Sequence, residues 1–474
     1  MEAVMKSKQV EPVVPVIDAA VLPKGWELTT IDAVCGKVEK TDPTQRPSEE
    51  FKYIDIGGID NQALRIVDTK AYLGKDAPSR ARQVVKAHDV VVSTVRTYLK
   101  NIALVPEELD GEVCSTGFCV LRGGNEWMGK YLYYFIQSDA VLKEIGKQQR
   151  GTSYPAVRDS DIKAQFIPLA PLPEQRRIVS AIETQLGRLD AAVARLHAAK
   201  AKLKRYKQAV LKAAFSGDMT EAWRAKAKVT PVDKMLARIE TPPRPSRYKS
   251  RSMDVVDGDY ALAIGAPERQ GPTGWKWLPL VDIARLESGH TPSKRHPEYW
   301  DGDVPWIELR DARDRHGATI HTTTYHTNQL GLDNSAARLL PAGTVCLSRT
   351  ASVGYVVKMG VPMCTSQDFV NWVCTEAIDP DWLKLLFVAE HDAIWRFGKG
   401  TTHTTVYFPE VVSFHVLLPP IEEQREIVRL VADALTTTEE IEATLDAQLL
   451  KSTRLRQAVL KRAFEGRLVS SNGS

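Results

Sequence analysis

PLPEQRRIVSAIETQLGRLDAAVARLHAAKAKLKRYKQAVLKAAFSG, residues 171–217, recurs in the same chain as PIEEQREIVRLVADALTTTEEIEATLDAQLLKSTRLRQAVLKRAFEG, residues 420–466. The copies align without a gap at a spacing of 249 residues, and 20 of the 49 pairs that start at Pro171 are identical. An internal repeat of this length reveals the organisation of a chain more reliably than a short motif. The sequence therefore predicts two similar halves, each ending in this stretch.

Each copy is predicted to form one long helix. Prolines stand at the start, at Pro171, Pro173 and Pro420, and Gly217 and Gly466 stand at the end, as expected at helix boundaries. Apolar residues recur at intervals of three and four, which is close to the heptad pattern of a coiled coil. The residues expected in the coiled coil and its partner contacts are Ile182, Leu189, Val193, Leu196, Leu203, Val210, Val431, Leu435, Leu445, Leu449 and Val459.

Polar residues interrupt the apolar stripe in both copies, at Lys200 and Lys207 in the first and at Thr438, Glu442 and Ser452 in the second. About 43 residues at ~1.5 Å per residue form a rod of roughly 65 Å, which has no surface of its own to cover the stripe. We therefore expect the two helices to pair antiparallel, with one globular domain at each end. The alternative is that each helix docks separately on its own domain.

The repeat extends beyond the helices. Gly25-Trp26 and Gly274-Trp275 stand 249 residues apart, and residues 79–93 resemble residues 335–348. The expected fold class is mixed α/β (α+β): two globular α/β domains separated by two long antiparallel helices, related by a pseudo-twofold internal repeat. The expected parts are a tail (1–21), domain 1 (22–170), a central helix (171–219), a basic linker (220–270), domain 2 (271–419), a C-terminal helix (420–468) and a tail (469–474).

Short strands and aromatic-rich helices are expected within each domain. VVKAHDVVVST (84–94), LLPAGTVCLS (339–348), FCVLR (118–122) and FVNWVC (369–374) are typical of strands. Residues 130–146 and 381–397 are each predicted to form a helix. These signals favour an α/β domain with a curved, partly antiparallel sheet.

The composition is that of a soluble globular protein, with 43% hydrophobic and 26% charged residues. No run of 18 apolar residues predicts a membrane span, and the N-terminal stretch lacks the apolar core of a signal peptide. The six cysteines are scattered, which favours reduced thiols and a cytoplasmic location. The net charge of +4 permits a nucleic-acid partner without requiring one. Much of the basic excess falls in residues 224–251, expected to be a flexible linker, either solvated or in contact with DNA.

Several motifs together resemble one known family. They are the EQRRIV and EQREIV helix starts, the QAVLKAAFSG and QAVLKRAFEG ends, GWELTTIDAV (25–34) and GWKWLPLVDI (274–283), and SRTASVGYV (348–356) with its looser counterpart STVRTYLKNIALV (93–105). From about residue 22 to 468, the chain resembles the DNA-specificity subunit of type I restriction-modification enzymes.

The resemblance implies that each globular domain is a target-recognition domain for one half of a bipartite DNA target. It also implies that the paired helices set the spacing of the half-sites and dock two modification subunits, which methylate adenine. Restriction subunits would join through these to give an ATP-dependent translocating nuclease. By this resemblance the chain itself binds no cofactor, and S-adenosylmethionine, ATP and Mg belong to the partner subunits.

The sequence contains no recognisable catalytic apparatus. A phosphate-binding GxxxxGK[ST] loop is absent, because FGKGTT (397–402) has neither the upstream Gly nor a hydroxyl residue directly after the Lys. An amino-methylase motif and the spacing of a hydrolase site are absent too. Cys114 and Cys119 lack a second metal-ligand pair, and His290, His296, His316, His321 and His326 lack nearby thiols, so no metal site is expected. These absences favour a non-catalytic subunit.

Two other classes of function remain open. A fused restriction-modification enzyme would carry methylase and nuclease domains that this chain lacks. A coiled-coil adaptor that binds protein and not DNA would not need two divergent domains with guanidinium- and hydroxyl-rich loops. DNA binding that depends on added partner subunits would separate the specificity subunit from the adaptor.

Residues that read DNA offer forked or amide donors to base edges and cations or hydroxyls to phosphates. Four loops concentrate these types, at 93–101 and 148–154 in domain 1 and at 348–352 and 399–404 in domain 2. The alternative for each loop is a solvated turn. The candidate DNA-binding residues are Ser93, Thr94, Arg96, Thr97, Tyr98, Lys100, Gln149, Arg150, Thr152, Ser348, Arg349, Thr350, Ser352, Lys399, Thr401, Thr402 and His403.

Overall fold

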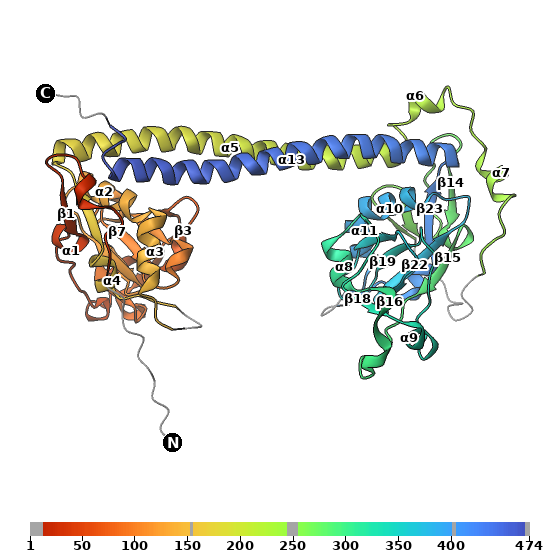
Figure 1. Cartoon of the computed structure of the whole chain (residues 1–474), viewed down its shortest axis with the longest axis horizontal. Helices are drawn as coiled ribbons and strands as arrows, with labels where there is room; N and C mark the ends of the chain where they lie inside the picture. The colour runs from red at the N-terminus through yellow and green to blue at the C-terminus, as the bar shows by residue number, and fades with distance from the viewer. Residues whose placement is uncertain (1–12, 152–154, 244–254, 401–403, 470–474) are drawn as a thin grey trace, which may run out of the picture. The chain divides into compact units, whose positions relative to one another are not determined.

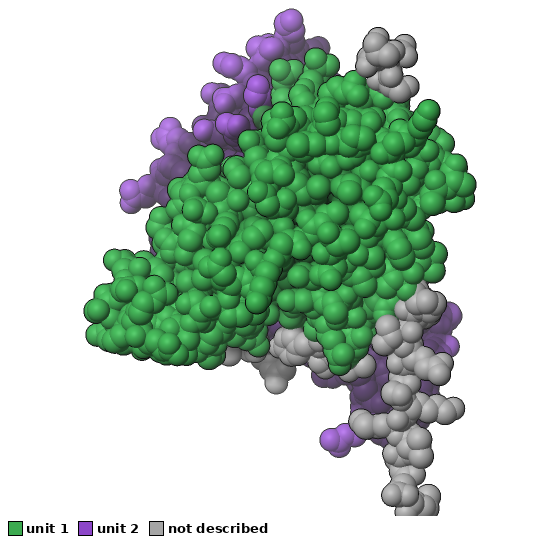
Figure 2. Space-filling view, turned by 90° about the vertical axis from the view of Figure 1, so that its left-hand side faces the viewer, with its two compact units in different colours: residues 1–198, 445–474 green, residues 199–444 purple. Residues whose placement is uncertain are grey.

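The computed structural model describes residues 13–151, 155–243, 255–400 and 404–469 (Figure 1). The chain divides into two compact units (Figure 2). Unit 1 comprises residues 1–198 and 445–474, and unit 2 comprises residues 199–444. Each unit therefore combines one globular domain with a segment of each of two long helices.

The two long helices predicted from the repeat are confirmed. Helix α5 (Leu172–Ser216) has 45 residues and α13 (Ile421–Phe464) has 44. The helix segments in each unit are paired, because their apolar residues share one core. In unit 1, Ile182 of α5 lies in the same buried cluster as Leu460 of α13, and in unit 2 Val210 lies with Val431. All the residues expected in the coiled coil are buried or half-buried.

Cross-helix ion pairs show that the pairing is antiparallel within each unit. In unit 2, Lys207 Nζ lies 2.6 Å from Glu442 Oε2, while Arg224, just beyond the end of α5, reaches Glu423 near the start of α13. In unit 1, Asp190 of α5 pairs with Arg456 of α13, whereas residues earlier in α5 pack near the end of α13. Lys207 and Glu442, which interrupt the two apolar stripes, thus neutralise each other.

The two helices end in the same way. Gly217 and Gly466 both adopt positive φ, at 81° and 69°, a conformation that glycine adopts without strain. A Cβ atom on Gly217 would collide with Pro272, and one on Gly466 would collide with Pro23. Pro23 and Pro272 stand 249 residues apart, so the repeat includes the contact between each helix end and the first residues of a domain.

The domain of unit 1 contains small mixed sheets covered by helices. Strand β2 pairs parallel with β9 and antiparallel with β5, and the other pairs in this domain are antiparallel. The sheets, in strand order, are β5 (Lys70–Leu73), β2 (Glu50–Ile54), β9 (Val113–Ser115) and β6 (Ala81–Val84); β10 (Phe118–Leu121), β7 (Val90–Ser93) and β8 (Ile102–Leu104); β1 (Glu27–Thr30) and β11 (Phe166–Leu169); and β3 (Ile59–Asp60) and β4 (Arg65–Ile66). The helices are α1 (Ile31–Val34), α2 (Glu126–Ile136), α3 (Asp139–Lys147) and α4 (Asp159–Lys163).

The domain of unit 2 repeats this design with a larger sheet. Parallel pairs join β16 to β21 and β17 to β20, and the remaining pairs are antiparallel, which confirms the mixed α/β class. The sheets are β15 (Ala284–Ser288), β22 (Phe369–Cys374), β19 (Val345–Ser348), β20 (Val356–Met359) and β17 (Thr319–Ile320); β18 (Tyr325–Thr327), β16 (Trp300–Ile307) and β21 (Cys364–Thr365); and β12 (Val256–Asp257), β13 (Leu262–Ile264), β23 (Phe414–Leu418) and β14 (Lys276–Pro279). The helices include α8 (Leu309–Asp314), α9 (Gln329–Asp333), α10 (Pro380–Ala389), α11 (His391–Phe397) and α12 (Phe408–Val412).

Each of the two shorter helices predicted as one element is broken in two. Residues 130–146 fall in α2 and α3, because Ser138 is extended and starts α3. Residues 381–397 fall in α10 and α11, which meet at Glu390. This carboxylate is fully buried and accepts backbone N–H bonds from Asp259, Tyr260 and Leu262 at 2.6–3.1 Å. Burial raises the pKa of Glu390 above its ordinary value. The break therefore anchors the hairpin of β12 and β13, a contact that local sequence does not reveal.

Part of the expected basic linker is packed and not solvated. Helices α6 (Glu221–Arg224) and α7 (Val232–Leu236) follow α5, and Val232 and Met235 are buried in the core of unit 2. The basic residues Arg244, Arg247, Lys249 and Arg251 lie outside the described residues. The described part of this segment therefore packs on unit 2 and contacts the start of α13, where Arg224 pairs with Glu423.

The contact between this segment and α13 centres on Glu423, which has no exposed surface. Its carboxylate accepts hydrogen bonds from Thr220 Oγ1 at 2.6 Å, Arg224 Nε at 2.8 Å and Trp275 Nε1 at 2.9 Å. The Arg224 guanidinium also lies over the Trp275 ring, 5.7 Å from its centre. A buried carboxylate is stable only when its donors are all present.

Replacing Arg224 with Ala should therefore cost about 3 kcal/mol of the unfolding free energy of unit 2, because Glu423 would keep a buried charge without its cation. Urea unfolding followed by tryptophan fluorescence measures the loss. Arg269→Ala is the matched control, since Arg269 also lies over a tryptophan, Trp277, but pairs with Asp257 in an exposed position. This control should cost at most about 1 kcal/mol. Equal losses in the two variants would contradict the role given to Glu423.

Candidate nucleic-acid interface

The sheet of unit 2 brings several loops to one edge. In the antiparallel pairs, Ser288 at the end of β15 lies opposite Val370 at the start of β22, and Ser348 at the end of β19 lies opposite Phe369. Strand β20 begins at the same edge, beside the end of β19. The loops 289–296, 349–355 and 366–368 therefore meet there.

The second candidate loop of unit 2 joins this edge. Lys399 and Thr405 pair as a β-bridge, and the N–H of Val406 donates to the carbonyl oxygen of Arg349 at 2.9 Å. The segments around 349 and 399–405, 50 residues apart in the chain, are thus held together by backbone hydrogen bonds. Thr401, Thr402 and His403 lie outside the described residues.

Within residues 348–352, the hydroxyls of Ser348 and Thr350 bond inside the protein, whereas the side chain of Arg349 stacks on an aromatic ring. Ser348 is buried, and its hydroxyl donates to the Ser352 carbonyl at 2.5 Å and accepts from the Tyr355 N–H at 2.8 Å. Thr350 Oγ1 donates to Asp368 Oδ1 at 2.6 Å. The Arg349 guanidinium lies over the Phe408 ring, 4.4 Å from its centre. Stacking on an aromatic ring orients the plane of a guanidinium.

The domain of unit 1 forms the corresponding edge. Ser93 at the end of β7 lies opposite Phe118 at the start of β10, and Val92 lies opposite Ile102 at the start of β8. The N–H of Arg96 donates to the Pro155 carbonyl and that of Val157 to the Thr94 carbonyl, each at 2.8 Å. The candidate loops 93–101 and 148–154 of this domain are therefore adjacent as well.

Most candidate side chains of unit 1 are engaged within the protein. Ser93, Thr94 and Thr97 are buried, and their hydroxyls bond respectively to the Val95 carbonyl, the Gly117 carbonyl and Gln149 Nε2. Lys100 Nζ lies 2.6 Å from Asp139, and Arg150 lies 2.5 Å from Asp161. Lys399 of unit 2 is similarly held, 2.8 Å from Glu410. Tyr98 is 61% exposed, and Thr152 lies outside the described residues. Tyr98 is thus the most exposed of the candidate side chains in residues 93–101.

Backbone strain is concentrated in these loops. Among the described residues, six other than glycine have positive φ, and three of them are Arg96 (49°), Lys100 (55°) and Ala351 (59°). Arg96 and Lys100 flank the short 3₁₀ turn Thr97–Leu99, which carries Tyr98. Non-glycine residues in this conformation cluster where a protein binds or reacts.

The loop 289–296 is a basic segment at the same edge that sequence reasoning missed. Lys294 Nζ lies 5.5 Å from the centre of the Trp306 ring and 5.6 Å from that of Tyr325. Thr291 of this loop hydrogen-bonds to Gln367 of the neighbouring loop. The signal for it in the sequence is the run HTPSKRH (290–296), which combines two adjacent cations with a hydroxyl residue on either side of Pro292.

In the described part of the chain, no group of three or more His, Cys, Asp or Glu side chains is suited to a metal ion. Of the five histidines considered above, four are exposed and His326 is half-buried. Desolvation and the neighbouring His391 lower the pKa of His316. The helices of the described part also include none long and apolar enough to cross a membrane.

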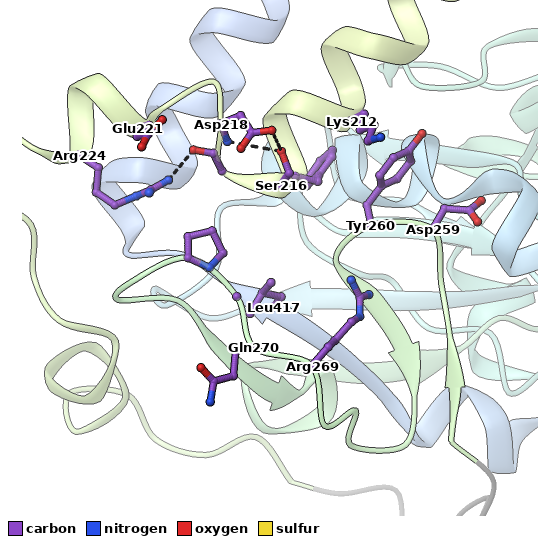
Figure 3. A pocket seen from close by; sticks show the side chains of 14 residues that line it. Lys212, Ser216, Asp218, Glu221, Arg224, Asp259, Tyr260, Arg269, Gln270 and Leu417 are labelled. Atoms are coloured by element: carbon purple, nitrogen blue, oxygen red, sulfur yellow. Dashed lines mark hydrogen bonds between the residues drawn. The ribbon is translucent and has the colours of Figure 1, made fainter.

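A cavity of about 480 Å³ at the end of α5 is lined by groups of both charges (Figure 3). Arg224 bonds to Glu423 and to the Gly217 carbonyl, and Arg269 pairs with Asp257. Ser216 donates to Asp218, and no histidine or cysteine lines the cavity. Arg224 and Asp218 therefore stabilise the helix end.

The chain was compared with known proteins. The family model for the type I restriction modification DNA specificity domain matches residues 23–200 and 272–451. The EcoKI specificity subunit of Escherichia coli (strain K12) is 22% identical over 472 residues, covering 96% of this chain and 91% of that protein. A solved structure of the type I R-M system, on its complex assembly and conformational transition, matches with a TM-score of 0.74 and 28% identity, covering 94% of this chain and 99% of the other. The HsdS subunit from Thermoanaerobacter tengcongensis matches with a TM-score of 0.53 and 28% identity, covering 94% and 98%.

The ion pair of Arg150 and Asp161 should hold the β-bridge between Arg150 and Ala156. Burial alone would raise the pKa of Asp161, but hydrogen bonds from Arg150 and from the Arg158 N–H bring it below its ordinary value. Replacing Asp161 with Asn should therefore accelerate hydrogen exchange of the Arg150 and Ala156 amides, which bond to each other's carbonyls, by several-fold. Asp32→Asn, which removes an exposed pair with Lys163, is the control and should leave both amides unchanged.

The same contact predicts a pH dependence. Because the folded-state pKa of Asp161 is lowered, its stabilisation is complete above the ordinary value of about 4 and is lost as the pH falls through the lowered value. Exchange of the two amides, corrected for intrinsic rates, should accelerate at that acidic pH in the natural chain and show no such step in Asp161→Asn. A step in both proteins would assign the effect to another carboxylate.

Proposed function

The chain belongs to the family of type I restriction-modification DNA specificity subunits, which serve DNA sequence recognition, and we propose that each of its two domains reads one half of a bipartite DNA target. The observation that carries the proposal is that both domains gather their basic and hydroxyl-bearing loops at one sheet edge. Base edges and phosphates of duplex DNA are recognised by these residue types.

The two edges offer different chemistry, as two different half-sites require. Unit 2 presents Arg349 over Phe408, and a guanidinium is the side chain that best matches the two acceptors of guanine. Unit 1 presents Tyr98 on a strained turn between Arg96 and Lys100. Lys294 of unit 2, held beside aromatic rings, is suited to a phosphate. Buried candidates such as Ser93, Thr94 and Ser348 position these loops through their hydrogen bonds.

The paired helices set the distance between the half-sites in this proposal. A helix has a fixed rise per residue, so a helix pair is a rigid spacer whose length follows from its sequence. The internal repeat gives the chain two equivalent helix ends. Two copies of one modification subunit would dock on them, and restriction subunits would join through those copies.

The chain acts as a non-catalytic subunit in the cytoplasm in this proposal and binds no cofactor itself. S-adenosylmethionine would be held by the modification subunits, and ATP and Mg by the restriction subunits. The residues of this chain would select the DNA and position it for chemistry that its partners perform.

Exchanging residues 24–170 for those of a relative with another target should change one half-site and leave the other half-site and the gap unchanged. The expected result follows because domain 2 and the helices stay as they are. Methylation mapping of DNA from cells that express the hybrid with its modification subunit measures all three quantities. A change in both half-sites would contradict the assignment of one half-site to each domain. Methylation that never depends on this chain would favour the protein-binding adaptor.

Replacing Arg349 with Ala should weaken binding to the natural target by about 1–3 kcal/mol, because one bidentate base contact would be lost. Competition binding by the complete methyltransferase complex to DNAs that differ at single positions measures the effect. The discrimination should fall at one position of one half-site only. Arg269→Ala is the matched control, since Arg269 also stacks on a tryptophan but lies outside the loop edge. An equal loss on all DNA sequences would make Arg349 a phosphate contact instead.

A further inference from the structure

The loop edges of the two domains are built alike, so their residues can be matched one by one. Thr94 follows β7 and Arg349 follows β19, the strands that end at the two edges. The Thr94 N–H donates to the carbonyl of Gly117, the residue just before β10, at 2.9 Å. The Arg349 N–H donates to the carbonyl of Asp368, the residue just before β22, at 2.8 Å. Thr94 and Arg349 therefore occupy equivalent positions.

The segments that close the two edges match as well. The carbonyl oxygens of Thr94 and Arg349 accept from the N–H groups of Val157 and Val406 respectively, which stand 249 residues apart. Helices α4 and α12 begin two residues later in each segment and have five residues each. Their first residues, at positions 159 and 408, are therefore a second matched pair beside the first.

In unit 2 the residues at the two matched positions are stacked. The Arg349 guanidinium lies over the Phe408 ring, 4.4 Å from its centre, and both residues are half-buried. Backbone hydrogen bonds on both sides also hold Arg349 in place. A guanidinium held in this way has fewer orientations to lose when it binds a flat pair of acceptors such as those of guanine. Phe408 is therefore suited to orient Arg349.

In unit 1 the position of Phe408 is taken by a carboxylate. The short side chain of Thr94 is buried, and its hydroxyl donates to the Gly117 carbonyl at 3.0 Å. Asp159 is half-buried, and its carboxylate forms no hydrogen bond or ion pair within the part of the chain that the structure describes. Burial raises the pKa of Asp159, and the charges of Lys40 and Lys163 lower it only in part. This edge therefore carries an acceptor that has no donor.

The first position of a helix is an ordinary place for an acidic residue, because the carboxylate lies near the positive end of the helix dipole. Helix α4 does not depend on Asp159 for this, since Asp161 accepts the Arg158 N–H at the helix start at 2.7 Å. Helix α12 forms with Phe408 at the same position. A carboxylate beside DNA is also repelled by the phosphates unless it meets a donor. An unpaired Asp159 at this edge is therefore explained better by a donor on the DNA.

We propose that the matched positions determine one base in each half-site: Asp159 accepts a hydrogen bond from the exocyclic amine of a cytosine, and Phe408 orients Arg349 towards a guanine. The proposal rests on the proposed function, in which each domain reads one half-site. Carboxylates in the major groove accept from cytosine N4, just as arginine donates to guanine O6 and N7. One position on a common framework thus carries opposite hydrogen-bonding chemistry in the two domains.

The role of Asp159 is tested with the complete methyltransferase complex and its natural target, found by methylation mapping. Single cytosines of the target are replaced by a pyrimidinone that lacks the amine. The natural chain should lose about tenfold in affinity at one cytosine of the half-site read by domain 1, because one charge-assisted hydrogen bond is lost. Asp159→Ala should bind the natural and the substituted DNA equally.

Asp32→Ala is the matched control. Asp32 is another carboxylate that lies near Lys163, at 3.6 Å, but it belongs to α1 and not to the loops of the edge. This variant should keep the tenfold difference between the two DNAs. Thermal unfolding of both variants should match that of the natural chain, which separates a loss of recognition from a loss of folding.

The role of Phe408 is tested by a double-mutant cycle with Arg349. Phe408→Leu keeps an apolar side chain but removes the ring, so it should lower several-fold the discrimination at the one base pair that Arg349→Ala affects. Phe408→Tyr keeps the ring and should retain this discrimination. In the Arg349→Ala background, Phe408→Leu should have no further effect, because the residue that it orients is absent.

The outcomes separate the inference from the function on which it rests. A complex that shows no preference among DNA sequences would overturn both. A bipartite target that loses no affinity at any cytosine replaced, or loses it equally in Asp159→Ala, would overturn the role of Asp159 and leave the proposed function standing. A Phe408→Leu effect of the same size with and without Arg349 would show that Phe408 only packs, and would overturn its positioning role.

Discussion

Burial of the apolar stripe between two antiparallel helix segments is the constraint on which each unit depends. The stripe of a single long helix has no partner within that helix, and the helix segments of each unit lie more than 200 residues apart in the chain. Within each unit, the domain contacts the helix segments at a helix end. Phe464 enters the core of one domain and Phe215 that of the other. Both copies of the repeat have a phenylalanine at this position because each helix end packs into the core of a domain.

Two of the polar residues that interrupt the stripe, Lys207 and Glu442, are matched across the helix pair. A lysine at a seam position is costly when it is desolvated alone. Arg456 and Asp190 form a second ion pair between the helices. Seam residues of this kind oppose any sliding of one helix along the other, because a shift would place each charge against an apolar neighbour. The buried Glu423 adds a similar restriction at the start of α13, since its three donors fit a single arrangement.

The parts of the structure that could be predicted from sequence are those determined by local periodicity. The heptad spacing, with the prolines and glycines at its ends, predicts both long helices to within four residues at either end, and short apolar segments predict β7, β10, β19 and β22. The break at Glu390 could not be predicted, because its cause is a hairpin more than 120 residues earlier in the chain. The candidate loops were found from residue type alone. Composition did not show which of their cations were already paired, since Lys100 and Lys399 meet their carboxylates only after folding.

The two edges illustrate how a fixed framework supports different recognition. In both domains the end of one strand lies beside the start of its neighbour, and backbone hydrogen bonds fix the loops that follow. The side chains that build these loops, such as Ser93 and Ser348, are buried and recur in both domains. The candidate side chains that these loops carry differ in chemistry: Tyr98 is exposed in one domain, and Arg349 is half-buried on the Phe408 ring in the other. Because the loop backbone is held by groups beneath it, an exposed residue such as Tyr98 can change without loss of the turn that presents it. This separation allows the domains to diverge while the helices that join them stay alike.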